Sequence, residues 1–169
     1  MKNPSATTGI RRAATRADCA VIAELAETIW REHYTPIIGK PQVDYMLRHF
    51  QSAAAISDQM EAGMHYYLLE HEGRPAGYFA FEKQGDHLFL SKIYVLGNLR
   101  GKGLGKSAMA FISGEARQGC CQAITLTVNR HNSASIAAYE RMGFRLQDAV
   151  IKDIGGGFVM DDYRMRLEL

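Results

Sequence analysis

Cysteine is scarce in this chain of 169 residues, and its spacing predicts neither a disulfide framework nor a metal centre. The three cysteines are Cys19, Cys120 and Cys121, and an odd number with two adjacent members does not form a set of pairs. No C-x-x-C pair and no His/Cys pair at zinc-ligand spacing occurs, so we expect no structural metal site. We interpret Cys120 and Cys121 as reduced thiols in the core or at a strand edge.

The sequence also lacks long apolar runs and a strong excess of charge of either sign. No apolar run approaches the ~20 residues of a membrane-spanning helix, and residues 1–9 lack the apolar segment of a secretory signal. We therefore expect a cytoplasmic protein without a membrane partner. The formal net charge of +2 is too small to predict nucleic-acid binding, because such domains concentrate positive charge on one face.

Length and apolar content suit one domain over residues 1–169, with residues 1–8 as a flexible segment. Thr15 is predicted to cap a helix, with Asp18 placed to complete a capping box. Apolar spacing predicts four helices, at residues 16–33, 42–60, 105–118 and 133–142. Apolar and β-branched runs predict seven strands, at residues 10–14, 66–69, 76–82, 88–95, 123–128, 144–150 and 158–169. The result is an α/β chain in which a strand-loop-helix-strand segment follows an antiparallel meander.

A glycine-rich loop follows the fourth predicted strand and leads directly into a helix. It contains the segment Arg100-Gly101-Lys102-Gly103-Leu104-Gly105-Lys106-Ser107. Helix N-termini attract phosphate through unpaired N–H groups and a partial positive charge, and glycines let a phosphate approach the backbone. Three alternate glycines with three interleaved cations therefore predict a phosphate-binding loop rather than a flexible turn.

Two common nucleotide motifs do not fit this loop. Gly105-Lys106-Ser107 matches the end of a Walker A motif, but the first glycine of that motif would fall on Arg100. The dinucleotide motif G-x-G-x-x-G also fails, because the loop has the spacing G-x-G-x-G. The acidic residue expected about 20 positions later is missing as well.

The loop instead resembles the [RQ]-x-x-G-x-[GA] coenzyme A motif of the GNAT acetyltransferase superfamily, with Arg100, Gly103 and Gly105 on the fixed positions. The segment from Asn132 to Phe144 resembles a second motif of that family, N-x-x-[AS]-x-x-x-Y-x-x-x-G-F. The two motifs occur in the family's order, with a predicted helix and strand between them. The resemblance covers roughly residues 8–169, with the best match in 88–145.

This resemblance implies the α/β (α+β) acyl-CoA N-acyltransferase fold, a central mixed, mostly antiparallel, seven-stranded sheet flanked by about four helices. It implies acetyl-CoA as cofactor, transfer of its acetyl group to a primary amine by direct attack in a ternary complex, and a homodimer. The tail at residues 155–165 resembles bacterial members that acetylate polyamines or other small amines. Two alternatives remain: an acceptor that is a protein, a peptide or an aminoacyl-tRNA, and a non-catalytic module that senses acetyl-CoA.

The resemblance also assigns residues to the cofactor. These are Ile93, Tyr94, Val95, Arg100, Gly101, Lys102, Gly103, Leu104, Gly105, Lys106, Ser107, Asn129, Asn132 and Tyr139. In the family, the strand before the loop splays from its neighbour and offers its backbone to the pantetheine arm, a role that falls on Ile93 and Val95. The N–H of Val95 is then a candidate oxyanion donor.

Tyr139 would protonate the leaving thiolate, as the resemblance implies, although its ring could instead pack in the core with Ile136 and Phe144. Asn132 would order the loop or contact the cofactor, and Asn132 or Ser133 could cap the following helix.

The general base and the acceptor site are less defined. His87 shares a strand face with Ile93 and has a suitable pKa, but it lies near a turn, where it could simply be solvated. Glu82 is a second candidate base, and a chain of water molecules is a third possibility. Trp30 and Tyr34 are candidate contacts for a cationic acceptor. Acidic residues of the same regions could attract it or form solvated faces: Glu27, Glu32, Asp44, Asp161 and Asp162.

Overall fold

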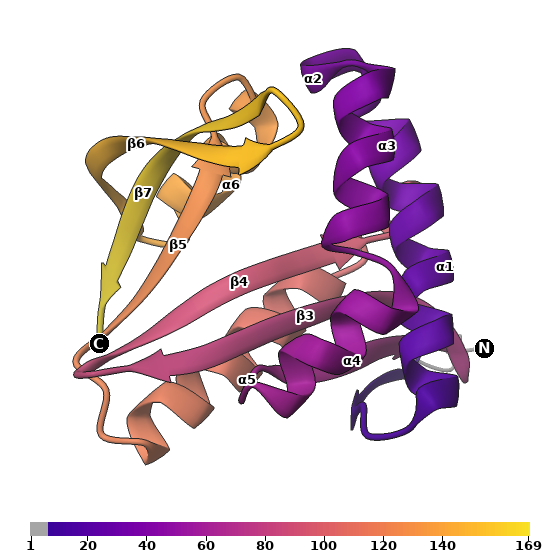
Figure 1. The fold of residues 1–169 in the computed structure, drawn as a ribbon. Coiled ribbons are helices and arrows are strands. Elements are labelled where there is room, and N and C mark those ends of the chain that lie inside the picture. The colour runs from indigo at the N-terminus through magenta and orange to yellow at the C-terminus, as the bar shows by residue number, and fades with distance from the viewer. Residues whose placement is uncertain (1–6) are drawn as a thin grey trace. The chain divides into compact units, whose positions relative to one another are not determined.

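A computed structural model describes residues 7–169. The helices are α1 (Arg16–His33), α2 (Thr35–Ile38), α3 (Lys40–His49), α4 (Ala53–Glu61), α5 (Leu104–Gln118) and α6 (Ser133–Arg141), with a 3-10 turn η1 at Gly97–Leu99 (Figure 1). The strands are β1 (Thr8–Arg12), β2 (His65–His71), β3 (Arg74–Gln84), β4 (His87–Val95), β5 (Ala123–Asn129), β6 (Arg145–Gly155) and β7 (Phe158–Glu168). The segment predicted as flexible, 1–8, lies outside the described residues except for its last two, and Thr8 already belongs to β1.

The strands form one seven-stranded sheet in the order β1-β2-β3-β4-β5-β7-β6. β4 and β5 pair in parallel, whereas β1 with β2, β5 with β7, and β6 with β7 pair antiparallel. β2, β3 and β4 are consecutive neighbours joined by short turns, which requires antiparallel pairing. The predicted mixed, mostly antiparallel sheet is therefore confirmed. The helix α5 provides the longer crossover that a parallel pair needs.

The described chain folds into two compact units, residues 7–80 with 92–111, and residues 81–91 with 112–169. The first unit holds α1 to α4, η1, the beginning of α5, the strands β1 and β2, the first part of β3 and the end of β4. The second unit holds the end of β3, the first part of β4, the rest of α5, and β5, α6, β6 and β7. A single domain over the whole chain stays a prediction.

In the first unit, helices cover both faces of β2 and β3 (Figure 1). Tyr66 and Tyr67 are adjacent in β2 and therefore point to opposite faces. The hydroxyl of Tyr66 donates a 2.6 Å hydrogen bond to Gln59 of α4, whereas the ring of Tyr67 lies 4.9 Å from that of Phe111 in α5. Helix α1 contacts α2, α3 and α4.

A buried lysine joins the polar cluster beneath α4. Lys92 in β4 is 8% exposed, and its ammonium group donates to the side-chain oxygen of Gln59 at 2.6 Å and to the hydroxyl of Tyr66 at 2.7 Å. Lys92 is not among the predicted site residues. These bonds tie β4 to β2 and α4.

The predicted helix 42–60 is wrong as a single element, because the chain breaks it into α3 and α4. Ser52 caps α4 by accepting a 3.2 Å hydrogen bond from the N–H of Ala55. The preceding Gln51 is buried and accepts a 2.9 Å hydrogen bond from the hydroxyl of Tyr78. The cap at Ser52 and the burial of Gln51 therefore separate two helices, although the apolar spacing continues through this region.

The two adjacent cysteines of the second unit have different environments. Cys121 is buried, as expected, but Cys120 is exposed in the turn between α5 and β5, with a φ of 59°. The interpretation of both residues as core or strand-edge thiols is therefore wrong for Cys120. The turn reverses the chain after α5 so that β5 can enter the sheet, and this leaves one of the two thiols outside.

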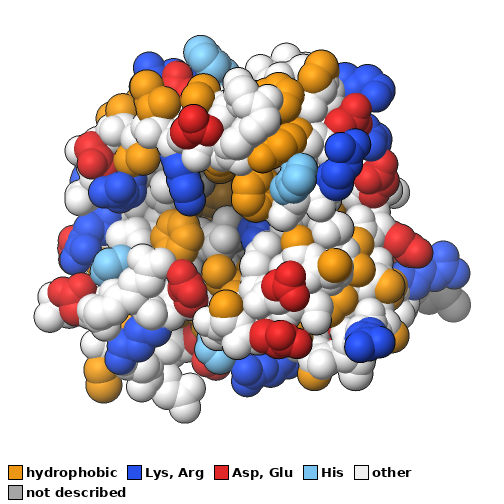
Figure 2. Space-filling model, viewed as in Figure 1, with side chains coloured by type: hydrophobic (Ala, Val, Ile, Leu, Met, Phe, Trp, Pro, Cys, Tyr) orange, Lys and Arg blue, Asp and Glu red, His pale blue; other side chains and the backbone are white. Residues whose placement is uncertain are grey.

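No helix in the described part of the chain is long and apolar enough to cross a membrane. Acidic and basic side chains are interspersed over the face drawn in Figure 2, with no large area of one sign. This distribution agrees with the small net charge.

The predicted capping box at the start of α1 is confirmed. The side chain of Thr15 accepts from the N–H of Asp18 at 3.1 Å, and the Asp18 carboxylate accepts from the N–H groups of Thr15 at 3.0 Å and Ala14 at 2.8 Å. Arg11 adds a 2.8 Å ion pair with the same carboxylate. The N–H of Ala14, followed by the Arg11 guanidinium, holds the pKa of Asp18 well below its usual range.

Asp18→Ala should lower the free energy of unfolding by about 2 kcal/mol near neutral pH, because backbone N–H groups lose a charged acceptor. Because the pKa of Asp18 is lower in the folded state than in the unfolded state, its carboxylate stabilises the fold at pH values above the unfolded-state pKa of about 3.9. This contribution is lost as the pH falls through the folded-state pKa. Urea unfolding should therefore show a higher free energy of unfolding for the wild type than for Asp18→Ala near neutral pH. This difference should decrease in acid. Glu61→Ala, an exposed change at the end of α4, should stay within about 0.5 kcal/mol at every pH. A loss for Asp18→Ala that is independent of pH would contradict the ionic origin.

Candidate active site

The end of β4 is held against β3 by a close backbone contact. The N–H of Leu96 donates to the carbonyl of Ala76 at 2.9 Å. A Cβ atom added at Gly77 would lie 2.2 Å from the carbonyl oxygen of Tyr94 and 3.0 Å from the Cα of Val95. Only glycine fits this position in β3 without a backbone shift, so Gly77 fixes the path of Tyr94 and Val95.

The pairing of β4 with β5 covers only the first part of each strand. It runs through four pairs, from His87 with Ala123 to Leu90 with Leu126. β4 continues to Val95 and β5 to Asn129, and in the described chain the register between them extends no further. Backbone polar groups require partners, so the edge of β4 after Leu90 can offer its N–H and C=O groups to a ligand. This edge includes Ile93 and Val95, for which the sequence analysis predicts pantetheine contacts.

The glycine loop ends in the first turn of α5. Gly101 and Gly103 have φ values of 77° and 84°, a backbone region that favours glycine. The first helical bond runs from the N–H of Ser107 to the carbonyl of Gly103, at 3.0 Å. The preceding N–H groups of the helix therefore lack intrahelical acceptors and can bind an anion.

The loop has room and charge for a pyrophosphate. A Cβ added at Gly103 or Gly105 would meet no atom within 4 Å, so the space above both glycines is open. Lys102 and Lys106 are exposed and form no ion pair with any residue that the structure describes. These features fit the pyrophosphate of coenzyme A.

Arg100 lies differently from the two lysines. Its Nε is 3.3 Å from the carbonyl oxygen of Val95, and its guanidinium also lies 3.3 Å from Nδ1 of His33 in α1. The sequence predicts three cations for the phosphate, whereas the structure shows the Arg100 side chain directed back to the end of β4. Arg100 thus connects the loop to the strand before it.

The second unit carries the other predicted cofactor residues. Asn132 is 3% exposed and occupies the N-cap position of α6, but its side chain makes no capping hydrogen bond, so the capping interpretation is wrong for Asn132. The side-chain oxygen of Asn129 accepts a 2.9 Å hydrogen bond from the N–H of His131. The half-buried ring of Tyr139 meets that of Phe144 edge-on, with centroids 5.7 Å apart. The packing role of Tyr139 is therefore present, and its role as the general acid stays a prediction.

The two predicted aromatic contacts for an acceptor form part of one cluster in the first unit. Trp30 is only 4% exposed, and its ring stacks on Tyr34 at 4.3 Å and meets the edge of Tyr94 at 5.6 Å. The predicted acceptor contact by Trp30 conflicts with this burial, because the ring is covered by its neighbours. Tyr34, at the C-terminal cap of α1, is half-buried, and its contact with an acceptor stays a prediction.

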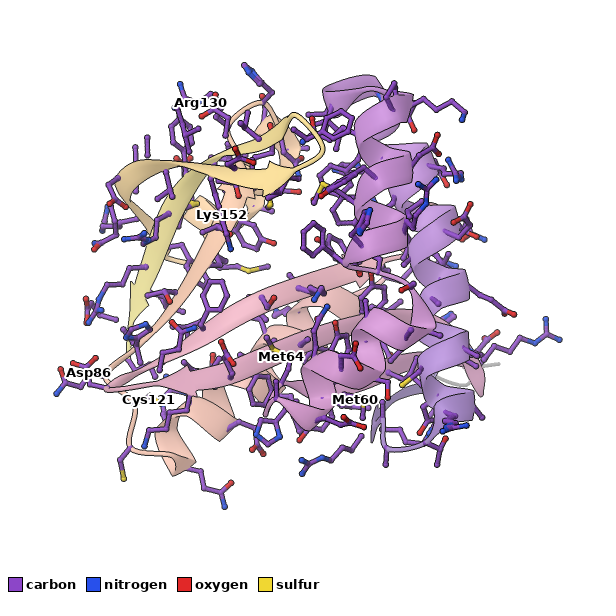
Figure 3. The ribbon with its side chains drawn as sticks, viewed as in Figure 1. Met60, Met64, Asp86, Cys121, Arg130 and Lys152 are labelled. Carbon is purple, nitrogen blue, oxygen red and sulfur yellow. The ribbon has the colours of Figure 1, made fainter. Side chains whose placement is uncertain are left out.

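The two candidate bases lie close to the turn between β3 and β4. Nδ1 of His87 is 3.3 Å from the Asp86 carboxylate, and Figure 3 labels Asp86 at this turn. Glu82 accepts a 2.8 Å hydrogen bond from the side chain of Gln84. His87 begins β4, whereas the cofactor loop follows its other end, at Val95. Both base assignments stay predictions.

Some of the predicted acidic residues form ion pairs with described basic residues, and others do not. Glu27 and Asp44 both bind Arg31, and Asp161 lies 2.8 Å from Nε of Arg130. Glu32 and Asp162 form no ion pair with any described residue.

Glu32 borders a groove of about 630 Å³ along α1. The groove is lined by Val21, Glu24, Leu25, Thr28, Glu32, Pro75, Leu96, Gly97 and Asn98. The carboxylate of Glu32 lies directly over Gly97, where an added Cβ would come within 2.6 Å of its oxygen. The lining thus contains two carboxylates and no cation, and it reaches η1 just before the phosphate loop.

Comparison with known proteins agrees with the two sequence motifs. The model of the acetyltransferase (GNAT) family matches residues 22–144, more than half of the chain. A search among curated proteins found no match.

Solved structures of low sequence identity share the fold. The PaiA N-acetyltransferase of Thermoplasma acidophilum, in complex with coenzyme A, has a TM-score of 0.80 at 17% identity, over 96% of this chain and 99% of that one. The ribosomal-protein-S18-alanine N-acetyltransferase of Escherichia coli has a TM-score of 0.71 at 17% identity, over 96% and 94%. The structure of yncA from Salmonella typhimurium, with its cofactor acetyl-CoA, has a TM-score of 0.61 at 22% identity, over 96% and 94%.

Proposed function

Because this chain belongs to the acetyltransferase (GNAT) family and is an acetyl-CoA-dependent N-acetyltransferase, we propose that its acceptor is a small cationic amine of the polyamine kind. The observation that carries the proposal is the groove along α1, lined by Glu24 and Glu32 without any cation. Neither carboxylate forms an ion pair with any residue in the range 7–169, so both favour a cationic ligand by direct attraction. A polyamine carries several ammonium groups, so more than one such carboxylate can contribute to its binding.

The cofactor roles follow from the loop and from β4. The free N–H groups at the start of α5, with Lys102 and Lys106, hold the pyrophosphate. The edge of β4 around Ile93 orients the pantetheine arm, and the N–H of Val95 stabilises negative charge on the acetyl oxygen. When bound, acetyl-CoA supplies an activated acyl group. We propose that the hydroxyl of Tyr139 donates the proton that the departing thiolate requires.

We expect the protein to acetylate polyamines faster than other amines. Release of coenzyme A, followed with a thiol reagent, should be fastest with spermidine or putrescine and slower with amino acids and short peptides. Glu32→Gln should raise the KM for spermidine about tenfold, because a charge-assisted contact contributes about 1.5 kcal/mol or more. The KM for acetyl-CoA should not change.

Glu27→Gln is the matched control, because the carboxylate of Glu27 is already bound to Arg31 in the same helix. Its KM for spermidine should stay within about twofold of the wild type. A preference for peptides over polyamines would indicate a protein acceptor instead. If acetyl-CoA binds and no amine reacts, the non-catalytic sensing module becomes the better account.

A further inference from the structure

Asp162 in β7 is a buried carboxyl group without compensation inside the protein. It is 6% exposed, and its carboxylate makes no hydrogen bond or ion pair with any residue in the described range 7–169. Burial, and secondarily the neighbouring Asp161, raises the pKa of Asp162 to about 6. A buried carboxylate normally has a cation or hydrogen-bond donors beside it, because desolvation of an unpaired charge is costly.

The adjacent strands do not provide that partner. In the sheet register, Asp162 lies opposite Asn129 of β5 on one side and Val150 of β6 on the other. Asn129 accepts the N–H of His131 through its side-chain oxygen, and its amide nitrogen makes no hydrogen bond to Asp162. Val150 is apolar and provides neither charge nor a hydrogen-bond donor.

The charged residues around Asp162 are either engaged elsewhere or exposed. Asp161 is bound by Arg130, and Arg164 pairs with Asp148 at 3.4 Å. Lys152 is the diagonal neighbour on β6, and it is exposed and forms no ion pair among the described residues. Figure 3 labels Arg130 and Lys152 in this unit. No cation among residues 7–169 therefore pairs with Asp162, so a cationic ligand can provide the balancing charge.

Asp162 lies beside the carboxyl end of β5. Asn129, its partner in the register, is the last residue of β5, which runs parallel to β4. In α/β sheets, ligands bind beyond the carboxyl ends of parallel strands. An unpaired carboxylate at this end of β5 has both the location and the charge to meet a cationic ligand.

We propose that Asp162 is the catalytic residue that receives the acceptor amine, binding its ammonium group and taking a proton from it. This inference rests on the proposed N-acetyltransferase function with a cationic acceptor. It assigns to Asp162 the role of base, for which the sequence predicts His87 or Glu82.

The proposed step moves one proton from the amine before the acetyl group is transferred. One proton of the ammonium group moves to the carboxylate of Asp162, which leaves a lone pair on nitrogen. The nitrogen attacks the carbonyl carbon of the acetyl thioester, so the C–N bond forms and the C–S bond breaks. Tyr139 donates its proton to the thiolate and receives a second proton from the nitrogen. Asp162 later releases its proton to water. The products are the acetamide, coenzyme A as a thiol, and one proton.

Asp162→Asn tests the assignment by turnover and by binding. Its kcat/KM for spermidine should fall about 100-fold, as expected for loss of a general base. The wild-type kcat/KM should decline in acid with an apparent pKa of about 6, because the base must be ionised, and the variant should lack this decline. Calorimetry without acetyl-CoA should show that the variant binds spermidine at least tenfold more weakly than the wild type does near neutral pH. The affinity of the wild type should fall by a similar factor below pH 6.

Asp148→Asn is the matched control, since Asp148 is an exposed aspartate of the adjacent strand, and it should behave as the wild type. The melting temperature of Asp162→Asn should equal or exceed that of the wild type near neutral pH, because a raised pKa means that the ionised group destabilises the fold there.

The outcomes separate this inference from the proposed function. If spermidine is acetylated but Asp162→Asn keeps wild-type turnover, affinity and pH profile, the role of Asp162 is overturned and the function stands. If spermidine binds in an Asp162-dependent manner but is not acetylated, amine capture by Asp162 stands and the proposed function falls. If spermidine neither binds nor reacts, both are overturned.

Discussion

Tyr139→Phe should lower kcat about 100-fold, within the range expected for loss of a general acid, while the KM for acetyl-CoA changes little. The substitution keeps the ring, so the edge-on contact with Phe144 and the packing of α6 remain. Only the hydroxyl is lost, and with it the proton that we propose for the thiolate. Steady-state kinetics with spermidine, beside a thermal melt, measure the effect on catalysis and on stability separately.

Tyr67→Phe is a suitable control, because it makes the same chemical change in β2, where the ring stacks on Phe79. It should leave kcat within about twofold of the wild type. If Tyr139→Phe also retains wild-type kcat, then Tyr139 serves the core alone, and another group or water protonates the thiolate.

Gly77→Ala should impair both stability and turnover, although Gly77 lies in β3, outside every motif in the sequence. The added Cβ would come within 2.2 Å of the Tyr94 carbonyl, so the end of β4 would have to move. Overpacking of this kind costs about 1–3 kcal/mol. The movement would also displace the N–H of Val95, and loss of an oxyanion donor lowers kcat by about 100-fold or more. Urea unfolding and kcat with saturating acetyl-CoA measure the two effects.

Gly114→Ala provides the contrast. Gly114 is exposed within α5, and a Cβ there would meet no atom within 4 Å. Alanine favours a helix over glycine by about 1 kcal/mol, so this variant should be slightly more stable and fully active. Wild-type stability and turnover in Gly77→Ala would show that β4 accommodates the methyl group without moving Val95.

Much of this fold was predictable, because it depends on interactions between residues that are close in the sequence. The capping box of Thr15 and Asp18 marks the start of α1, because its hydrogen bonds are local in sequence. The glycine loop was predictable for a similar reason, since the residues between β4 and α5 are consecutive. The break between α3 and α4 was not found, because a cap at Ser52 competes with an apolar period that continues across it.

Features that depend on distant contacts escaped the sequence analysis. A lone glycine in a strand can indicate a close backbone approach, but only the structure shows that Gly77 meets Tyr94. Arg100 fits the family motif by position, yet its contact with His33 depends on a helix more than sixty residues earlier. Asp161 and Asp162 look equivalent in sequence, and only the structure shows Asp161 bound to Arg130 while Asp162 is buried without a cation.

The exposed thiol of Cys120 has a practical consequence for every experiment on this protein. Cys19 and Cys121 are buried, so a maleimide dye should attach at a single place, in the turn after α5, without any engineered cysteine. The label would give a fluorescence reporter for the second unit during titrations. The same thiol adds a constant offset of about one equivalent per chain to any colorimetric count of coenzyme A, which an enzyme-only blank removes.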